Sequence, residues 1–268
     1  MRLINLRDFI AICILDIKSK VDGIREDGRV TVLLRSDVAK APLAGTLAIA
    51  LANAGWEIWL ITTKGAPDDL IEWRKWGFRN IASEQDRDTT ILPNAIYFRL
   101  DVKNANGDEV SQVDQAQRIF QAAYNRGGSG PSKVMVVVDE YVSVVPSTKN
   151  AGQALLDIFQ RGGGRTVGLI GLTQEPVYVP RQLISQATHI FLFTLTHIYD
   201  IKYARTICAD YVPPADRGDP YGFWYKWVDG PTNQWLYYPN QRAWYDDLRI
   251  AMPKPIEVPP QGLVTGVY

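Results

Sequence analysis

The sequence has little cysteine, little histidine, no excess of either charge and no long hydrophobic run. Its 268 residues include only two cysteines, Cys13 and Cys208, which lie far apart and in no metal-ligand spacing. This argues against a structural zinc site and against a disulfide-rich secreted scaffold, and it indicates a reducing compartment. Lys and Arg together number 29, as do Asp and Glu. No global positive field therefore draws the protein toward nucleic acid, and any such contact must come from local patches.

The apolar run near the start, Phe9–Leu15, is too short to cross a bilayer and is bounded by Asp8 and Asp16. No small-residue cleavage site follows it, so we expect an amphipathic helix packed on a neighbouring element rather than a signal peptide. The sequence thus predicts a protein with no membrane partner that works in the cytoplasm, which is the host cytoplasm if the source is viral.

Strand-like and helix-like patterns alternate through the middle of the chain, which predicts an α/β fold with a mainly parallel sheet covered by helices. We expect strands at Val30–Leu34, Trp56–Thr62, Ala95–Val102, Val134–Val138, Thr166–Thr173 and His189–Phe193. We expect helices at Leu43–Ala54, Ser111–Asn125 and Ala151–Gln160, a short one after Pro180, and one at Tyr199–Cys208. The predicted organisation is an N-terminal helix and linker (1–28), an α/β core (29–212) and a C-terminal region (213–268).

The C-terminal region is rich in aromatic residues and then in proline. Tyr221–Val228 and Gln234–Tyr238 flank an Asp-Gly-Pro turn, which predicts a β-hairpin appended to the core. The proline-rich stretch 253–260 predicts an extended tail. The eight tryptophans of the chain could stack on nucleic-acid bases, but packing in the core or at an interface is the commoner use and the one we favour.

Two adjacent acids, Asp139 and Glu140, follow the most apolar strand, in the sequence VMVVVDE. Carboxylates at the carboxyl end of a parallel strand lie where ligands bind in open α/β sheets. In a nucleoside triphosphatase the first acid would hold Mg²⁺ through water and the second would polarise the attacking water. The alternative is a strand that ends at a solvated, charged turn.

A second buried strand lies in the sequence GGGRTVGLIGLTQEP, from Gly162 to Pro176, and ends in a Thr-Gln pair. Next to the acid pair, Gln174 could contact a γ-phosphate or the attacking water, although it could also be a polar strand cap. The combination of an acid-tipped strand, a glycine-arginine turn and a glutamine-tipped strand favours a nucleotide site.

Residues 134–208, with the motifs VMVVVDE, RGGGRTVGLIGLTQEPVYVP and SQATHIFLFTL, resemble the FtsK/HerA group of RecA-like P-loop ATPases. Members of that group pump DNA through hexameric rings and include viral genome-packaging ATPases. The resemblance implies that Asp139 and Glu140 are the Walker B pair and that Gln174 is the sensor glutamine. It also implies that Arg165, or else Arg161, is an arginine finger that reaches a neighbouring subunit; the alternative for each is a solvated surface arginine.

The resemblance also places a Walker A loop after the first strand, within VLLRSDVAKAPLAG. In the pattern G-x-x-x-x-G-K-[ST], Lys40 keeps the lysine, but Leu34 and Ala39 replace the glycines and Ala41 replaces the hydroxyl residue. The cradle of backbone N–H groups is therefore expected to be misshapen, and Mg²⁺ to lose a ligand. Asp37 adds a negative charge that repels phosphate.

Lys40 and the helix that follows it would still attract an anion. Alternatively, Lys40 is a solvated first-turn lysine before a proline that starts the helix, or another basic residue such as Lys64 replaces the lost phosphate contacts. We favour the degenerate P-loop. The two histidines, His189 and His197, have no acid or cysteine at metal-ligand spacing and are interpreted as structural.

The sequence therefore predicts a subunit of an ATP-driven double-stranded DNA translocase or genome-packaging motor. Its expected cofactors are ATP and Mg²⁺, and its expected partners are DNA, further copies of itself in a hexameric ring, and a viral capsid vertex or an active paralogue. The competing hypothesis is a catalytically inactive P-loop-fold subunit with a structural or scaffolding role. The altered Walker A loop favours the competitor, whereas Asp139, Glu140, Gln174 and Arg165 favour the motor, because an inactive subunit has no physical need for them.

Overall fold

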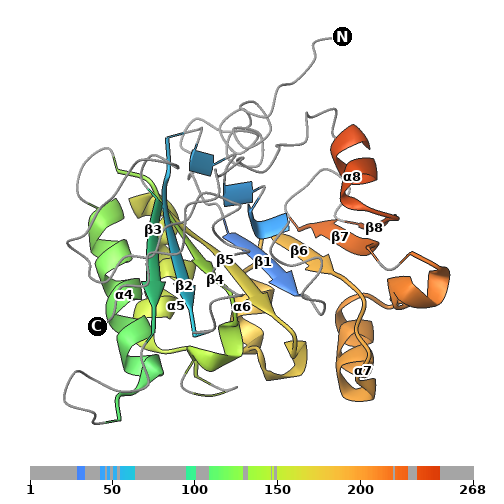
Figure 1. Cartoon of the computed structure of the whole chain (residues 1–268), viewed down its shortest axis with the longest axis horizontal. Helices are drawn as coiled ribbons and strands as arrows, with labels where there is room; N and C mark the ends of the chain where they lie inside the picture. The colour runs from blue at the N-terminus through green and yellow to red at the C-terminus, as the bar shows by residue number, and fades with distance from the viewer. Residues whose placement is uncertain are drawn as a thin grey trace, which may run out of the picture.

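The strands of the computed structural model form one eight-stranded sheet, in the order β3-β2-β4-β5-β1-β6-β7-β8 (Figure 1). The structure describes residues 29–33, 43–45, 47–48, 51–52, 55–63, 95–100, 109–128, 132–145, 147, 150–219, 221–228 and 234–247. The strands are β1 (Arg29–Leu33), β2 (Glu57–Thr62), β3 (Ala95–Arg99), β4 (Val134–Val138), β5 (Val167–Thr173), β6 (His189–Leu192), β7 (Phe223–Trp227) and β8 (Trp235–Tyr238). The pairings among β1 to β6 are parallel, whereas β6–β7 and β7–β8 are antiparallel. The mainly parallel sheet predicted from the sequence is confirmed.

The helices also follow the predicted order. They are α4 (Gln112–Gly127), α5 (Gln153–Arg161), α6 (Arg181–Ser185), α7 (Ile198–Ile207) and α8 (Gln241–Asp247), with short 3-10 helices η1 (Tyr141–Ser143), η2 (Gly162–Arg165), η3 (Pro176–Tyr178) and η4 (Pro214–Arg217). Residues 43–45, 47–48 and 51–52 are helical and buried. Gly55, with φ +86, follows them as the predicted helix end, and its N–H donates to the carbonyl of Ala52 at 3.0 Å. The predicted segments 1–28 and 253–260 lie outside the described residues.

The core on one face of the sheet lies beneath α4 and α5. The strand β4 is buried at every position, as a central parallel strand requires. The side chains of Phe120 from α4 and Phe159 from α5 belong to the same buried cluster as Val136 of β4. The helix α4 begins where the Ser111 hydroxyl accepts a hydrogen bond from the N–H of Asp114, a local signal that the sequence carries.

The aromatic hairpin is a continuation of the sheet rather than an appendage. Phe191 of β6 pairs with Tyr225 of β7 across an antiparallel ladder, and Figure 1 shows β7, β8 and α8 at the right-hand end of the sheet. Trp244 of α8 lies edge-on to Phe191 with ring centroids 5.2 Å apart. The sequence predicted the hairpin but not α8 or the pairing with β6, because that pairing joins segments far apart in the chain.

The tryptophans that the structure describes pack mainly inside the protein. Trp56, Trp59, Trp224 and Trp244 are buried, which supports the packing role over base stacking for these four. No helix among the described residues combines the length and the apolar character needed to cross a membrane.

Candidate active site

Two adjacent carboxylates lie at the carboxyl end of β4, near the middle of the sheet. Asp139 is 4% exposed, and its N–H donates to the carbonyl of Ile61 at 3.0 Å, which extends the β2–β4 ladder by one residue. Its Oδ2 accepts a hydrogen bond from the hydroxyl of Thr62 at 3.2 Å. Because a buried carboxylate needs hydrogen-bond donors, the last residue of β2 helps to hold Asp139 at the edge of the sheet.

The second carboxylate is held from the other neighbouring strand. Glu140 is half-buried, and its Oε1 accepts a hydrogen bond from the hydroxyl of Thr173, the last residue of β5, at 3.0 Å. The Thr173 oxygen in turn accepts the N–H of Glu175 at 3.1 Å. With both its donor and its acceptor capacity used, the Thr173 hydroxyl has a defined orientation and fixes the direction of Glu140.

The turn after Glu140 is anchored by an aromatic ring. Tyr141 begins η1 and is 2% exposed. Its ring lies so close to Gly171 of β5 that a Cβ there would be 3.2 Å from Tyr141 Cδ2, which is tighter than an ordinary contact. Burial raises the pKa of the Tyr141 hydroxyl well above its ordinary value. The glycine at 171 thus lets the ring clamp η1 and the preceding carboxylate onto the sheet.

Gln174 follows β5 directly, at the same edge of the sheet as both carboxylates. The registers pair Val138 of β4 with Gly171 of β5, and Thr173 of β5 with Leu33 of β1. Since β5 lies between β4 and β1, the ends of these three strands adjoin one another. The structure therefore brings Asp139, Glu140 and Gln174 to one edge, where open α/β sheets bind ligands.

The candidate Walker A residues Ala39, Lys40 and Ala41, like Lys64, lie outside the described residues. The last described residue before them, Leu33, is at the carboxyl end of β1, and the next, Leu43, is helical and buried. A strand therefore precedes the candidate phosphate-binding segment and a helical segment follows it, as expected on either side of such a segment.

Two residues of this constellation, Thr62 and Thr173, were missed by the sequence reasoning as partners of the acids. Both are the final residues of their strands, in WLIT and GLT, next to the strand that carries the carboxylates. A threonine that ends a predicted strand beside an acid-tipped one is the signal that could have identified them.

The candidate finger arginines lie at the opposite, amino edge of the sheet. Arg165 ends η2, just before β5, and its guanidinium stacks over the ring of Tyr124 at 4.4 Å. Arg161 ends α5 and lies 3.5 Å from Asp157. The seven residues of β5, at about 3.3 Å each, separate Arg165 from Gln174 by about 20 Å. Within one chain, neither arginine is brought to the carboxylates.

Mg²⁺ is the metal that the fold implies, and the side-chain oxygens present could hold it only together with other ligands. No group of three or more His, Cys, Asp or Glu side chains among the described residues could cage a metal alone. Asp139 and Glu140, however, are hard oxygen donors, and Mg²⁺ is commonly held by one or two carboxylates together with water and the phosphates of a bound nucleotide. The arrangement suits a metal that arrives with its nucleotide.

Of the two histidines, His189 is packed as a structural residue. His189 of β6 is buried, and its Nδ1 lies 3.0 Å from the hydroxyl of Tyr225. Burial lowers the pKa of His189 to about 4, so the ring is neutral at physiological pH. His197 is exposed at the start of α7, with Nδ1 3.8 Å from Asp200.

No family model and no curated protein matches the chain. The genome-packaging NTPase B204 of Sulfolobus turreted icosahedral virus 2, in its complex with sulfate, superposes with a TM-score of 0.59 at 15% identity and covers 79% of this chain and 96% of its own. The chain has the RecA-like P-loop fold. The same NTPase in complex with AMP gives a TM-score of 0.58 at 17% identity, with the same coverage.

A second similar structure is the pCW3 conjugation coupling protein TcpA with ATPγS, at a TM-score of 0.50 and 11% identity, covering 79% of this chain and 59% of that one. Identities this low establish the fold and no more. The resemblance to the FtsK/HerA group drawn from residues 134–208 is confirmed as a likeness of fold, since these structures superpose on 79% of the chain. One of the similar structures is a viral DNA-packaging ATPase.

Proposed function

We propose that this protein is a subunit of an ATP-driven double-stranded DNA translocase or genome-packaging motor that works as a ring in the cytoplasm. The observation that carries the proposal is the pair of carboxylates at the end of β4, each held by a threonine hydroxyl from an adjacent strand, on a RecA-like fold. Support comes from the fold neighbours, which are described as a genome-packaging NTPase in complex with ATPγS and a DNA-packaging ATPase.

In this proposal, Asp139 and Glu140 have different tasks. Asp139, buried and oriented by Thr62, would hold Mg²⁺ through water, and the bound ion would supply positive charge beside the nucleotide phosphates. Glu140, oriented by Thr173, accepts a proton from the water that attacks the γ-phosphate. Gln174 contacts that phosphate or that water, and Lys40 with the backbone at Ala39 and Ala41 contacts the phosphates.

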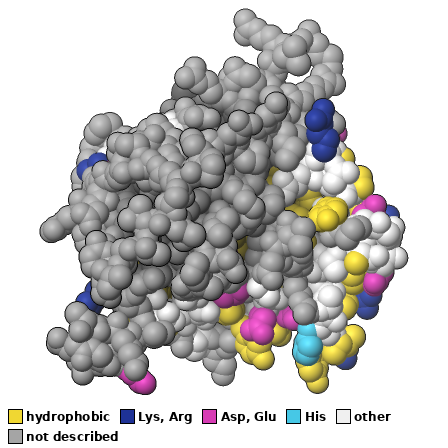
Figure 2. All heavy atoms as spheres, viewed as in Figure 1, with side chains coloured by type: hydrophobic (Ala, Val, Ile, Leu, Met, Phe, Trp, Pro, Cys, Tyr) yellow, Lys and Arg dark blue, Asp and Glu magenta, His cyan; other side chains and the backbone are white. Residues whose placement is uncertain are grey.

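The position of the arginines favours a ring. Because Arg165 lies about 20 Å from the carboxyl edge of its own sheet, it does not serve the site of its own subunit, and as an arginine finger it would act at the site of a neighbouring subunit. Exposed hydrophobic side chains lie near the carboxyl edge, where Tyr178 in η3 is 51% exposed and Tyr199 in α7 is 63% exposed. Figure 2 shows hydrophobic and acidic side chains gathered along the lower part of one face. Such a surface suits coverage by another subunit.

Mixing two inactive variants tests the proposal. Glu140→Gln and Arg165→Ala should each abolish ATP hydrolysis when assayed alone. In a mixture, an intact Glu140 from one variant can meet an intact Arg165 from the other, so activity should return to at most about a quarter of the wild-type rate at equal amounts. Arg161→Ala, which removes the other candidate finger, is the comparison, and it should keep the activity that Arg165→Ala loses. Activity of Arg165→Ala alone, or no recovery on mixing, contradicts the shared site.

The altered Walker A sequence favours a second function. With Leu34, Ala39 and Ala41 in place of two glycines and a hydroxyl, the chain could be an inactive scaffolding subunit that partners an active paralogue or a capsid vertex. A wild-type protein that binds no ATPγS in calorimetry would favour this alternative over the motor.

A further inference from the structure

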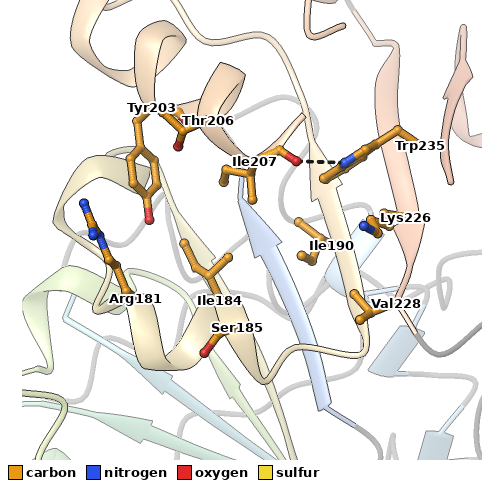
Figure 3. Close-up of a pocket in the computed structure, with 10 residues that line it drawn as sticks. All are labelled: Arg181, Ile184, Ser185, Ile190, Tyr203, Thr206, Ile207, Lys226, Val228 and Trp235. Atoms are coloured by element: carbon orange, nitrogen blue, oxygen red, sulfur yellow. Dashed lines mark hydrogen bonds between the residues drawn. The ribbon is translucent and has the colours of Figure 1, made fainter. Parts of the chain in front are cut away.

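A pocket of about 470 Å³ lies on the α6 and α7 side of the sheet, at the junction with the C-terminal hairpin. It is formed by α6, α7 and strands β6, β7 and β8, none of which carries the carboxylate site. Figure 3 shows Arg181 and Tyr203 on one side of the pocket, Lys226 and Trp235 on the other, and the isoleucines between them. Each wall thus presents one cation and one aromatic ring.

The two cations of the pocket have no counter-charge among the residues that the structure describes. No acidic side chain is among the described residues that line the pocket. Within the part of the chain that the structure describes, neither Arg181 nor Lys226 has an ion-pair partner. In a protein with equal numbers of acids and bases, two unpaired cations facing one cavity mark a place that favours an anion.

Lys226 is an unusual residue for its position in β7. Side chains two apart in a strand share a face, and Trp224, two residues earlier, is buried in the main core cluster. Lys226 therefore projects from the packed face of the sheet, where an apolar residue is expected, and is half-buried. Its Nζ lies 6.0 Å from the centroid of the Trp235 ring, which is the outer limit of a cation-π contact.

The rim of the pocket is held in place by a hydrogen bond. Trp235 Nε1 donates to the carbonyl of Ile207 at 3.0 Å, which ties β8 to the end of α7 (Figure 3). Ile184 and Ile190 are buried and supply an apolar floor. The hydroxyls of Ser185 and Thr206 also line the pocket. An apolar floor with a few polar groups in a preformed cavity of this size is typical of small-molecule sites.

We infer that this pocket binds a small organic anion, with a phosphate or carboxylate group held by one of the two cations, Arg181 or Lys226, and a flat or branched apolar body on the isoleucine floor. Arg181 offers a planar fork of donors and Lys226 a point charge, and either suits an oxygen anion. The aromatic rings of Tyr203 and Trp235 enclose the body of the ligand. This site is separate from the nucleotide site proposed at the carboxyl edge of the sheet.

Calorimetry with phenyl phosphate as the probe tests this inference on the full-length chain. Phenyl phosphate combines the anion and the ring, whereas inorganic phosphate and phenol each carry only one of them. We expect phenyl phosphate to bind at least tenfold more tightly than either fragment, and whichever of Arg181→Gln and Lys226→Gln removes the cation that holds the phosphate to weaken binding by about tenfold.

Two variants serve as controls. Lys202→Gln removes an exposed cation of α7 that lies over Tyr199 and outside the pocket, and Lys40→Ala alters the candidate phosphate loop; neither should change the affinity for phenyl phosphate. The inference is overturned if phenyl phosphate does not bind, if Arg181→Gln and Lys226→Gln bind it as the wild type does, or if Lys40→Ala abolishes binding.

Discussion

Thr173, the last residue of β5, orients the carboxylate of Glu140. Its hydroxyl donates to Glu140 and accepts from the N–H of Glu175. Thr173→Val keeps the shape and removes both bonds, so Glu140 loses its orienting partner. We expect ATP turnover to fall by about 10- to 100-fold with little change in nucleotide affinity, because a hydrogen bond to a charged group contributes about 1.5–3 kcal/mol. Steady-state ATPase kinetics of Thr173→Val check this, with Thr206→Val on α7 as the control. Equal losses of turnover in the two variants would contradict the role of Thr173.

Tyr141 provides a test of the packing beside the site. Its buried hydroxyl has no hydrogen-bond partner among the described residues, so Tyr141→Phe should raise the free energy of unfolding by about 1 kcal/mol. The buried Tyr211 hydroxyl, in contrast, donates to the carbonyl of Phe193 at 2.6 Å and accepts the N–H of Leu195 at 3.0 Å. Tyr211→Phe should therefore lower stability by about 1–3 kcal/mol. Urea denaturation of both variants measures these changes in stability. A loss of stability in Tyr141→Phe would show that the Tyr141 hydroxyl has a hydrogen-bond partner after all.

His189 should make stability depend on pH. Its folded pKa of about 4 lies below the ordinary value of 6.5, so between these values the unfolded chain binds a proton that the folded protein excludes. The contribution of His189 is complete above pH 6.5 and is lost as pH falls toward 4. From pH 7.5 to pH 5 this amounts to about 2 kcal/mol. Urea denaturation at both pH values should show that His189→Gln loses less unfolding free energy between pH 7.5 and pH 5 than the wild type. An equal loss in the two proteins would mean that another group causes the pH dependence.

At the scale of elements, the turn that carries Arg165 depends on close packing. A Cβ at Gly162 would lie 2.5 Å from the backbone oxygen of Val167, whereas a Cβ at Gly164 would meet nothing within 4 Å. Gly162→Ala should therefore lower the free energy of unfolding by about 1–3 kcal/mol through overpacking, and Gly164→Ala should be tolerated. Thermal unfolding of this pair measures the difference. If both variants unfold like the wild type, the close approach of η2 to β5 is wrong.

Most elements of the sheet were predictable from the sequence because their signals are local. The apolar run Val134–Val138 and the capping Ser111 with Asp114 each mark their own element. The acid pair and Gln174 were proposed as site residues because they directly follow such strands. The Thr62–Asp139 bond joins residues 77 positions apart, and the β6–β7 pairing is equally non-local. Contacts of this kind depend on the order of strands in the sheet, which no local pattern encodes.

At the scale of the whole molecule, the sheet places the carboxylates at one edge and Arg165 at the other. A chain with no net charge could attract DNA only through local positive surfaces. The proposed ring accounts for the position of Arg165, since each subunit would place this arginine at the site of its neighbour. It also accounts for DNA binding without net charge, since the ring would repeat any local DNA contact in every subunit.

The rate of ATP hydrolysis with and without double-stranded DNA, for the wild type and Glu140→Gln, tests the central claim most directly. The account predicts turnover that DNA stimulates and that Glu140→Gln abolishes while ATPγS binding persists. No hydrolysis by the wild-type protein under either condition, together with no nucleotide binding, would contradict it and leave the scaffolding subunit as the better description.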